Sequence, residues 1–180
     1  MKIAVLVGSL QEKSVNKMLA RAMEAHAPEG VEFIYADLNL PLFNQDVEAA
    51  AFPAEATKLK ELVELADGVL VVTPEYNRSF PGVLKNALDW ASRPWGQNSF
   101  DGKPAGIVGA SIAPTGTTQA QAQLRSVMVY LNTALLGQPE LYVNAPASFD
   151  ESGQPNEGTD EAIKNYVDTF IAHVQSATRS

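Results

Sequence analysis

Two polar segments of this chain carry side chains suited to holding a ligand, and each follows an apolar run. The first extends from Gly8 to Asn16 and offers hydroxyl and amide groups at Ser9, Gln11 and Ser14. Gly8 permits a tight turn, and the free N–H groups at the start of a helix attract an anion. These residues predict a cradle for a single phosphate group, although an ordinary serine-capped helix would begin with the same residue types. The triphosphate signature G-x-x-x-x-G-K-[ST] and the dinucleotide signature G-x-G-x-x-G are both absent.

The second segment reads TPEYNRSFPG and follows the apolar run that ends at residue 72. It places Glu75, Tyr76 and Asn77 between two prolines, Pro74 and Pro81. Proline restricts the backbone, so this loop can meet a ligand with little loss of conformational freedom. We predict that Tyr76 forms a wall of the site, and we assign no catalytic side chain.

The elements that position these segments alternate between strands and helices. The predicted strands are Ile3–Val7, Val31–Ala36, Val69–Val72, Pro104–Ala110 and Glu140–Val143, and the predicted helices are Ser14–His26, Pro53–Ala66, Pro81–Ser92, Thr118–Leu136 and Asp160–Val174. Most of the strands are apolar without alternation, which is typical of a parallel sheet covered on both faces. We therefore predict a single domain over residues 1–180, an α/β flavodoxin-like three-layer sandwich with a five-stranded parallel sheet in the order 2-1-3-4-5. Both polar segments would then lie at the switch point of the sheet, beyond the carboxyl ends of strands one and three.

A further loop, Pro114–Thr118, is rich in threonine and precedes the predicted helix 118–136. We expect Thr117 or Thr118 to cap that helix through its hydroxyl group.

Composition excludes several classes of function. The net charge is −8, with 13 Lys and Arg against 21 Asp and Glu, so nucleic acid and anionic membranes are not expected partners. The chain has no cysteine, which excludes disulfides, thiolate nucleophiles and cysteine-ligated metals. His26 and His173 stand apart from other metal-binding residue types, so no metal site is predicted. No signal peptide or membrane span is evident, and we expect a cytoplasmic protein. Redox chemistry would require a bound cofactor.

The motifs resemble those of a known family. Gly8-Ser-Leu-x-x-x-Ser-x-Asn16 and Pro74-Glu-Tyr-Asn-x-Ser-x-Pro-Gly-x-Leu-Lys-Asn-Ala-Leu-Asp-Trp90 are similar to motifs of the NAD(P)H-dependent FMN reductases, which include bacterial quinone, chromate and azo-dye reductases. Leu40-Pro-Leu-Phe-Asn-Gln-Asp46 resembles the loop after the second strand of that family. The similarity extends from about residue 2 to the final helix.

The resemblance implies that FMN binds without a covalent link. Its phosphate would contact Ser9, Gln11, Ser14, Val15 and Asn16, and its ring would lie against Pro74, Glu75, Tyr76 and Asn77, with Ser111 closing the edge. Gln11 stands where the family usually has arginine, so one charge-assisted phosphate contact becomes neutral. Replacing Ser14 or Asn16 with leucine is expected to weaken FMN binding and to leave the fold intact.

The function implied is an FMN-dependent NAD(P)H oxidoreductase. Hydride would pass from NADPH or NADH to N5 of FMN, and two electrons would then reduce a small-molecule acceptor such as a quinone, with chromate, azo compounds or flavin also open. One alternative is a flavodoxin-type electron carrier without NAD(P)H turnover of its own. Another is a nucleotide-binding module that has lost flavin, which only Gln11 favours. The family resemblance also implies a homodimer or homotetramer with the flavin site at the dimer interface, and the broad apolar surface predicted for helix 81–92 is consistent with such packing.

Overall fold

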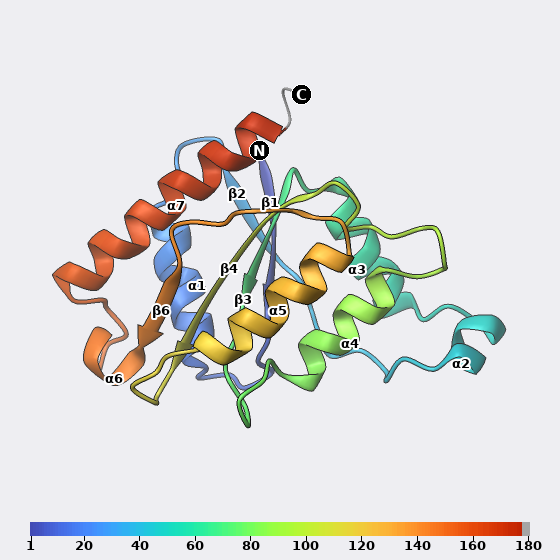
Figure 1. The fold of residues 1–180 in the computed structure, drawn as a ribbon, viewed down its shortest axis with the longest axis horizontal. Helices are drawn as coiled ribbons and strands as arrows, with labels where there is room; N and C mark the ends of the chain where they lie inside the picture. Colours follow the sequence, from blue (N-terminus) through green and yellow to red (C-terminus); the bar gives the residue numbers. More distant parts are fainter. Residues whose placement is uncertain (178–180) are drawn as a thin grey trace.

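In the computed structural model, which describes residues 1–177, parallel strands and helices alternate along the chain (Figure 1). The strands are β1 Lys2–Val7, β2 Glu32–Tyr35, β3 Gly68–Val72, β4 Pro104–Ser111, β5 Ala134–Leu135 and β6 Leu141–Asn144. The helices are α1 Val15–Ala25, α2 Gln45–Ala50, α3 Ala54–Leu65, α4 Gly82–Ala91, α5 Thr118–Tyr130, α6 Ala145–Ser148 and α7 Glu157–Ala177. None of these helices has both the length and the apolar character needed to cross a membrane.

The sheet has the predicted order, with one addition at its edge. The strands β2, β1, β3 and β4 pair in parallel in that order. The outer edge of β4 then pairs with two short strands. The strand β5 lies beside Pro104 and Ala105, and β6 lies beside the stretch from Val108 to Ser111. The prediction 2-1-3-4-5 is confirmed, and the fifth position of the sheet is shared between β5 and β6.

The apolar strands bury side chains on both faces of the sheet. In β1, Ile3 and Val5 belong to the core formed with α1 and α7, whereas Ala4 and Leu6 belong to the core formed with α3, α4 and α5. Figure 1 shows α1 and α7 together on one side of the sheet and α3, α4 and α5 on the other. The three-layer arrangement is therefore confirmed, and it follows from strands that are apolar without alternation.

The predicted helix from Thr118 to Leu136 is too long. The helix α5 ends at Tyr130, and Asn132 has a φ of 57°, in the left-handed region that stops a helix. Leu135 lies in β5, where it covers part of the edge of β4. Pairing with β4 satisfies backbone groups that would otherwise be left at an open sheet edge, and this overrides the local helical pattern.

The aromatic residues around α4 occupy different environments. Trp90 and Phe100 are fully buried, whereas Trp95 is 80% exposed. The Trp90 indole N–H donates to the carbonyl oxygen of Pro41 at 2.7 Å, and its ring meets Phe43 and Phe52 edge-on. The loop before α3 thus covers the outer side of α4, so the broad apolar surface of this helix is explained within one chain.

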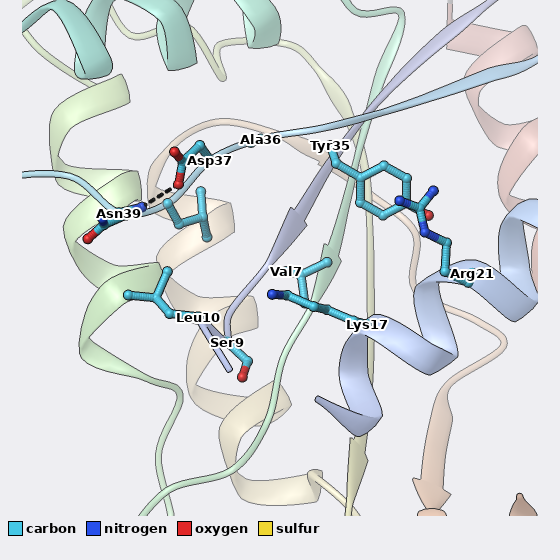
Figure 2. A pocket seen from close by; sticks show the side chains of 10 residues that line it. Val7, Ser9, Leu10, Lys17, Arg21, Tyr35, Ala36, Asp37 and Asn39 are labelled. Carbon is cyan, nitrogen blue, oxygen red and sulfur yellow. Dashed lines mark hydrogen bonds between the residues drawn. The ribbon is translucent and has the colours of Figure 1, made fainter. Parts of the chain in front are cut away.

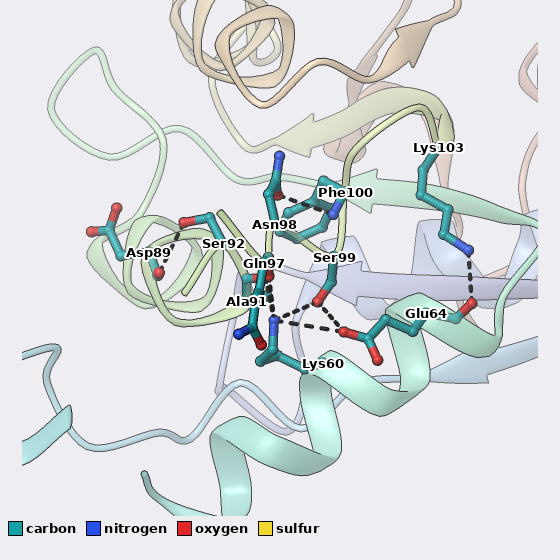
Figure 3. Close-up of polar contacts among 10 residues, drawn as sticks. All are labelled: Lys60, Glu64, Asp89, Ala91, Ser92, Gln97, Asn98, Ser99, Phe100 and Lys103. Atoms are coloured by element: carbon teal, nitrogen blue, oxygen red, sulfur yellow. Dashed lines mark hydrogen bonds and ion pairs between the residues drawn. The ribbon is translucent and has the colours of Figure 1, made fainter. Parts of the chain in front are cut away.

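Two lysines fasten the segment between α4 and β4 to α3 (Figure 3). Lys60 Nζ donates to the carbonyl oxygen of Gln97 at 2.8 Å and to Ser99 Oγ at 2.7 Å. Lys103 Nζ donates to the carbonyl oxygens of Glu64 and Ala66 at the end of α3, at 2.8 and 2.7 Å. Burial lowers the pKa of both lysines, and neighbouring carboxylates partly oppose that shift.

Candidate functional site

The two polar segments meet in one cavity of about 460 Å³ at the carboxyl end of the sheet. It is formed by the loop between β1 and α1, the loop between β3 and α4, and the end of β4, and we call it the switch-point cavity. Its lining residues are Gln11, Lys13, Ser14, Val15, Asn16, Pro74, Glu75, Tyr76, Ala110, Ser111 and Ile112. All the predicted site residues except Ser9 and Asn77 line this cavity.

The first segment presents hydrogen-bond donors to the cavity. From residue 10 to residue 15, the backbone N–H groups make no hydrogen bond to any residue that the structure describes. Ser14 caps α1, since its Oγ accepts the N–H of Asn16 at 3.2 Å, and its hydroxyl proton remains free to be donated. Lys13 adds a positive charge, whereas Gln11 is neutral. Free N–H groups at a helix start, a hydroxyl and one ammonium group suit a phosphate.

Gly8 brings the two segments close together. A Cβ atom at this position would lie 3.2 Å from Cδ of Pro74 and 3.4 Å from side-chain atoms of Pro81 and Leu84. A side chain here would require Pro74 or the first loop to shift by a few tenths of an ångström, so glycine allows the two segments to approach this closely.

Asn16 lines the cavity and also connects two elements of the fold. Its side chain is buried, with Nδ2 donating to the carbonyl oxygen of Ala110 at 2.8 Å and Oδ1 accepting the Ala110 N–H at 2.9 Å. Its carboxamide therefore joins α1 to β4, which leaves one proton of Nδ2 for any further contact. The expectation that leucine at position 16 leaves the fold intact conflicts with this arrangement.

The second segment forms a tight turn. Tyr76 and Ser79 exchange two backbone hydrogen bonds, of 2.9 and 3.0 Å, and the residues between them, Asn77 and Arg78, have φ values of 52° and 66°. Two successive positive φ values define a type I′ turn. The turn places Asn77 at its tip, outside the cavity lining, and uses both the N–H and the carbonyl of Tyr76. The backbone N–H of Tyr76 is thus already bonded within the turn, and Tyr76 meets the cavity through its side chain.

Glu75 attaches this turn to α5. Its Oε2 accepts the N–H groups of Gln119 and Ala120, at 2.9 and 3.0 Å, in the first turn of that helix. Gln123 adds two bonds, because its Nε2 donates to the carbonyl oxygen of Arg78 at 2.7 Å and its Oε1 accepts the Ser79 hydroxyl at 2.8 Å. The expected threonine cap is wrong, since Thr117 makes no side-chain capping bond and the carboxylate of a distant loop does so instead.

The rim of the switch-point cavity is apolar. Tyr76 is 52% exposed and Ile112 is 76% exposed, so the cavity opens between two large hydrophobic side chains. Sequence reasoning missed Ile112 and Ala110, although both flank the predicted Ser111. The rule that ligands lie beyond the carboxyl ends of the strands, applied to the whole end of β4, would have included them.

Ser9 faces a different cavity, of about 480 Å³, on the side of the loop toward β2 (Figure 2). We call it the β2-side cavity. Arg21 on its edge bonds Glu24 at 2.6 Å and lies 3.9 Å from the ring centre of Tyr35. Burial raises the pKa of Tyr35, and its hydrogen bond to Glu24 raises that pKa further. Within residues 1–177, no group of His, Asp and Glu is arranged to hold a metal ion.

Comparisons with known proteins agree with this geometry. Residues 1–147 match the model of a family described as NADPH-dependent FMN reductase. The chain is 47% identical, over 97% of both sequences, to a 2-hydroxy-1,4-benzoquinone reductase of a Burkholderia species. It is 41% identical to a quinone reductase of Pseudomonas putida, covering 96% of this chain and 94% of that one.

Solved structures of other proteins share this fold. The flavoenzyme NAD(P)H:(acceptor) oxidoreductase FerB of Paracoccus denitrificans superposes with a TM-score of 0.91 at 37% identity, over 98% of both chains. A flavodoxin of Pseudomonas aeruginosa superposes with a TM-score of 0.61 at 19% identity, over 97% of this chain and 99% of that one, and this likeness concerns the fold alone.

Proposed function

Because the chain belongs to the NADPH-dependent FMN reductase family, we propose that it uses FMN to carry electrons from NADPH or NADH to a quinone. The observation that carries the proposal is the switch-point cavity, which joins the two motifs of the family across β1, β3 and β4. Two relatives described as a 2-hydroxy-1,4-benzoquinone reductase and a quinone reductase, at 47% and 41% identity, favour a quinone over the other acceptors of the family.

The residues of the switch-point cavity fit FMN. Its volume of about 460 Å³ lies in the range of small-molecule sites. FMN has one phosphate, and the first loop offers unpaired N–H groups and the Ser14 hydroxyl for one such group. Pro74 and Tyr76 supply flat apolar surface for a ring. FMN, when bound, supplies the chemistry of accepting a hydride and releasing two electrons.

In this proposal the chain itself binds and orients. The N–H groups from residue 10 to residue 15, with Ser14 and Lys13, neutralise the phosphate. Val15 and Gln11 add backbone and amide contacts, and Ser111 borders the opposite edge. Glu75 and Gln123 keep the turn at residues 76–79 fixed to α5, so the wall of the ring site does not need to be ordered on binding. No side chain is required to donate or remove a proton at the reacting atom.

A reconstitution experiment tests this function. The purified protein is mixed with FMN, and visible absorbance after desalting reports whether the flavin is retained. NADPH or NADH oxidation is then followed with 1,4-benzoquinone as acceptor. Retained flavin with continuous turnover supports the reductase. Retained flavin without turnover, unless a separate reductase is added, would support an electron carrier, and a protein that stays colourless would overturn both.

We further propose that a second copy of the chain covers the apolar rim of the switch-point cavity. Tyr76 and Ile112 project large exposed hydrophobic surface at this rim, and exposed apolar patches of this kind mark interfaces. Light scattering after size-exclusion chromatography should show a dimer or a tetramer. The variant Ile112→Glu should shift this equilibrium toward monomer, and Leu65→Glu, on the exposed end of α3, serves as the control. A wild-type monomer at high concentration would contradict the proposal.

A further inference from the structure

The β2-side cavity has no role in binding FMN as proposed above. It lies across the phosphate loop from the switch-point cavity and encloses about 480 Å³. Figure 2 shows Val7 and Leu10 on one side and Ala36 after β2 on another, with Lys17 extending from α1 toward Val7 and Leu10. The cavity therefore combines apolar walls with an ammonium group.

Two cations line this cavity, Lys17 and Arg21. Within residues 1–177, Lys17 forms no ion pair. Arg21, by contrast, is paired with Glu24 at 2.6 Å. The only carboxylate among the lining residues is Asp37, which accepts the backbone N–H of Asn39 at 2.9 Å and turns toward that residue (Figure 2). A free lysine beside apolar walls suits a phosphate attached to an aromatic base.

A row of cations joins the two cavities. Lys17 and Arg21 are four residues apart and lie along one side of α1, and Lys13 lies in the loop just before that helix. Lys13 lines the switch-point cavity, and Lys17 and Arg21 line the β2-side cavity. In a chain of net charge −8, this row gives an anionic co-substrate a local path of favourable potential.

A neighbouring groove between α1 and residues 152–155 shares these cations but suits a phosphate less well. Glu12 and Asp160 also line it, and their carboxylates oppose an anion. The β2-side cavity has a second advantage, because in dinucleotide-binding sheets the adenosine ribose lies at the end of the second strand. Ala36 and Asp37 occupy that position here. A carboxylate at this position favours a free 2′-hydroxyl, but that of Asp37 is turned away to accept the N–H of Asn39, which leaves Lys17 as the charged group that faces the cavity.

We propose that the β2-side cavity binds the adenosine end of NADPH, with Lys17 contacting the 2′-phosphate. This assignment rests on the proposed function, because the nicotinamide ring must reach the flavin in the switch-point cavity. NADH lacks the 2′-phosphate, so Lys17 sets the preference of the enzyme for NADPH over NADH.

The first test compares co-substrates. In Lys17→Met the ratio of kcat/KM for NADPH to kcat/KM for NADH should fall by about tenfold, since methionine cannot make a charge-assisted bond to the phosphate. Lys17→Arg should restore most of the ratio. Lys58→Met removes an exposed lysine of α3 and controls for the change in net charge. An unchanged ratio, including an equal loss with both co-substrates, would overturn the role of Lys17.

The second test needs no hydride transfer. Calorimetry measures the binding of 2′,5′-ADP and of 5′-AMP to the FMN-loaded protein and to the protein without FMN. We expect 2′,5′-ADP to bind about tenfold more tightly than 5′-AMP, and Lys17→Met to abolish the difference. A protein that shows this difference but oxidises no NAD(P)H would leave the cavity assignment standing while the proposed function fails. A protein that turns over NADPH without this difference would overturn the cavity assignment alone.

Discussion

The carboxamide of Asn16 and the backbone of Ala110 form a reciprocal pair of buried hydrogen bonds, of 2.8 and 2.9 Å. The pair joins the first turn of α1 to the end of β4, and the two residues are 94 positions apart in sequence. Both walls of the switch-point cavity depend on it, because Ser14 and Val15 lie just before Asn16 and Ser111 follows Ala110. Asn16 thus supports the site through the fold.

Asn16→Leu should lower the free energy of unfolding by about 2–4 kcal/mol, because it removes two buried hydrogen bonds and leaves the N–H and carbonyl of Ala110 unpaired. Urea denaturation of the FMN-free protein measures this change. Asn165→Leu, at an exposed position of α7, is the matched control and should have little effect. Equal stability of Asn16→Leu and wild type would contradict the structural role. It would instead favour a role of Asn16 in binding the phosphate.

Glu75→Gln should destabilise the protein by about 1–2 kcal/mol, because a charged cap at the start of α5 becomes neutral. Amide hydrogen exchange gives a local readout, and the N–H groups of Gln119 and Ala120 should exchange faster in the variant. Glu151→Gln changes the same charge in an exposed loop and should leave both amides protected. Unaltered exchange at both amides would show that the cap is not formed in solution.

Arg78→Gly should stabilise the protein by about 1 kcal/mol, because Arg78 has a φ of 66° and glycine adopts that conformation without strain. The substitution also removes a 3.8 Å ion pair between a largely exposed guanidinium and Glu75, which contributes little to stability. Asn77→Gly, at the other central position of the turn, should gain less because asparagine tolerates positive φ. Urea midpoints measure both variants, and a destabilised Arg78→Gly would show that the arginine side chain stabilises the turn by more than its backbone strain costs.

The parallel sheet and the position of the site could be predicted because they follow from local patterns. The continuous apolar runs of β1, β3 and β4 require two covered faces, and the switch point then fixes which loops meet. What each polar side chain does there could not be predicted in the same way. Asn16 and Glu75 have residue types that suit a ligand, yet both bond to distant backbone groups that come near only in the folded chain.

The predicted end of α5 was wrong for a related reason. Leu131 and Leu135 continue the apolar spacing of the helix, so the local pattern favours a longer element. The stop depends on Asn132 in a left-handed conformation and on the free edge of β4, which attracts residues 134–135 into the sheet. Competition between helix and sheet edge is decided by the tertiary fold, and a single sequence does not reveal it.

Tyr166 should make the protein sensitive to alkali. Its ring is fully buried, its hydroxyl donates to the carbonyl oxygen of Ile107 at 3.1 Å, and burial raises its pKa above the ordinary 10.0. Above pH 10 the unfolded chain therefore releases a proton that the folded chain retains, so the free energy of unfolding falls by about 1.4 kcal/mol per pH unit from this group.

Tyr166→Phe isolates that contribution. At pH 8 the variant should be less stable than wild type by about 1 kcal/mol, because one buried hydrogen bond is removed. Between pH 10 and pH 11 the difference should shrink, since phenylalanine has no proton to release and all other titrating groups are common to both proteins. Urea denaturation at several pH values measures the difference. A gap that stays constant up to pH 11 would mean that Tyr166 ionises in the folded protein as readily as in the unfolded chain.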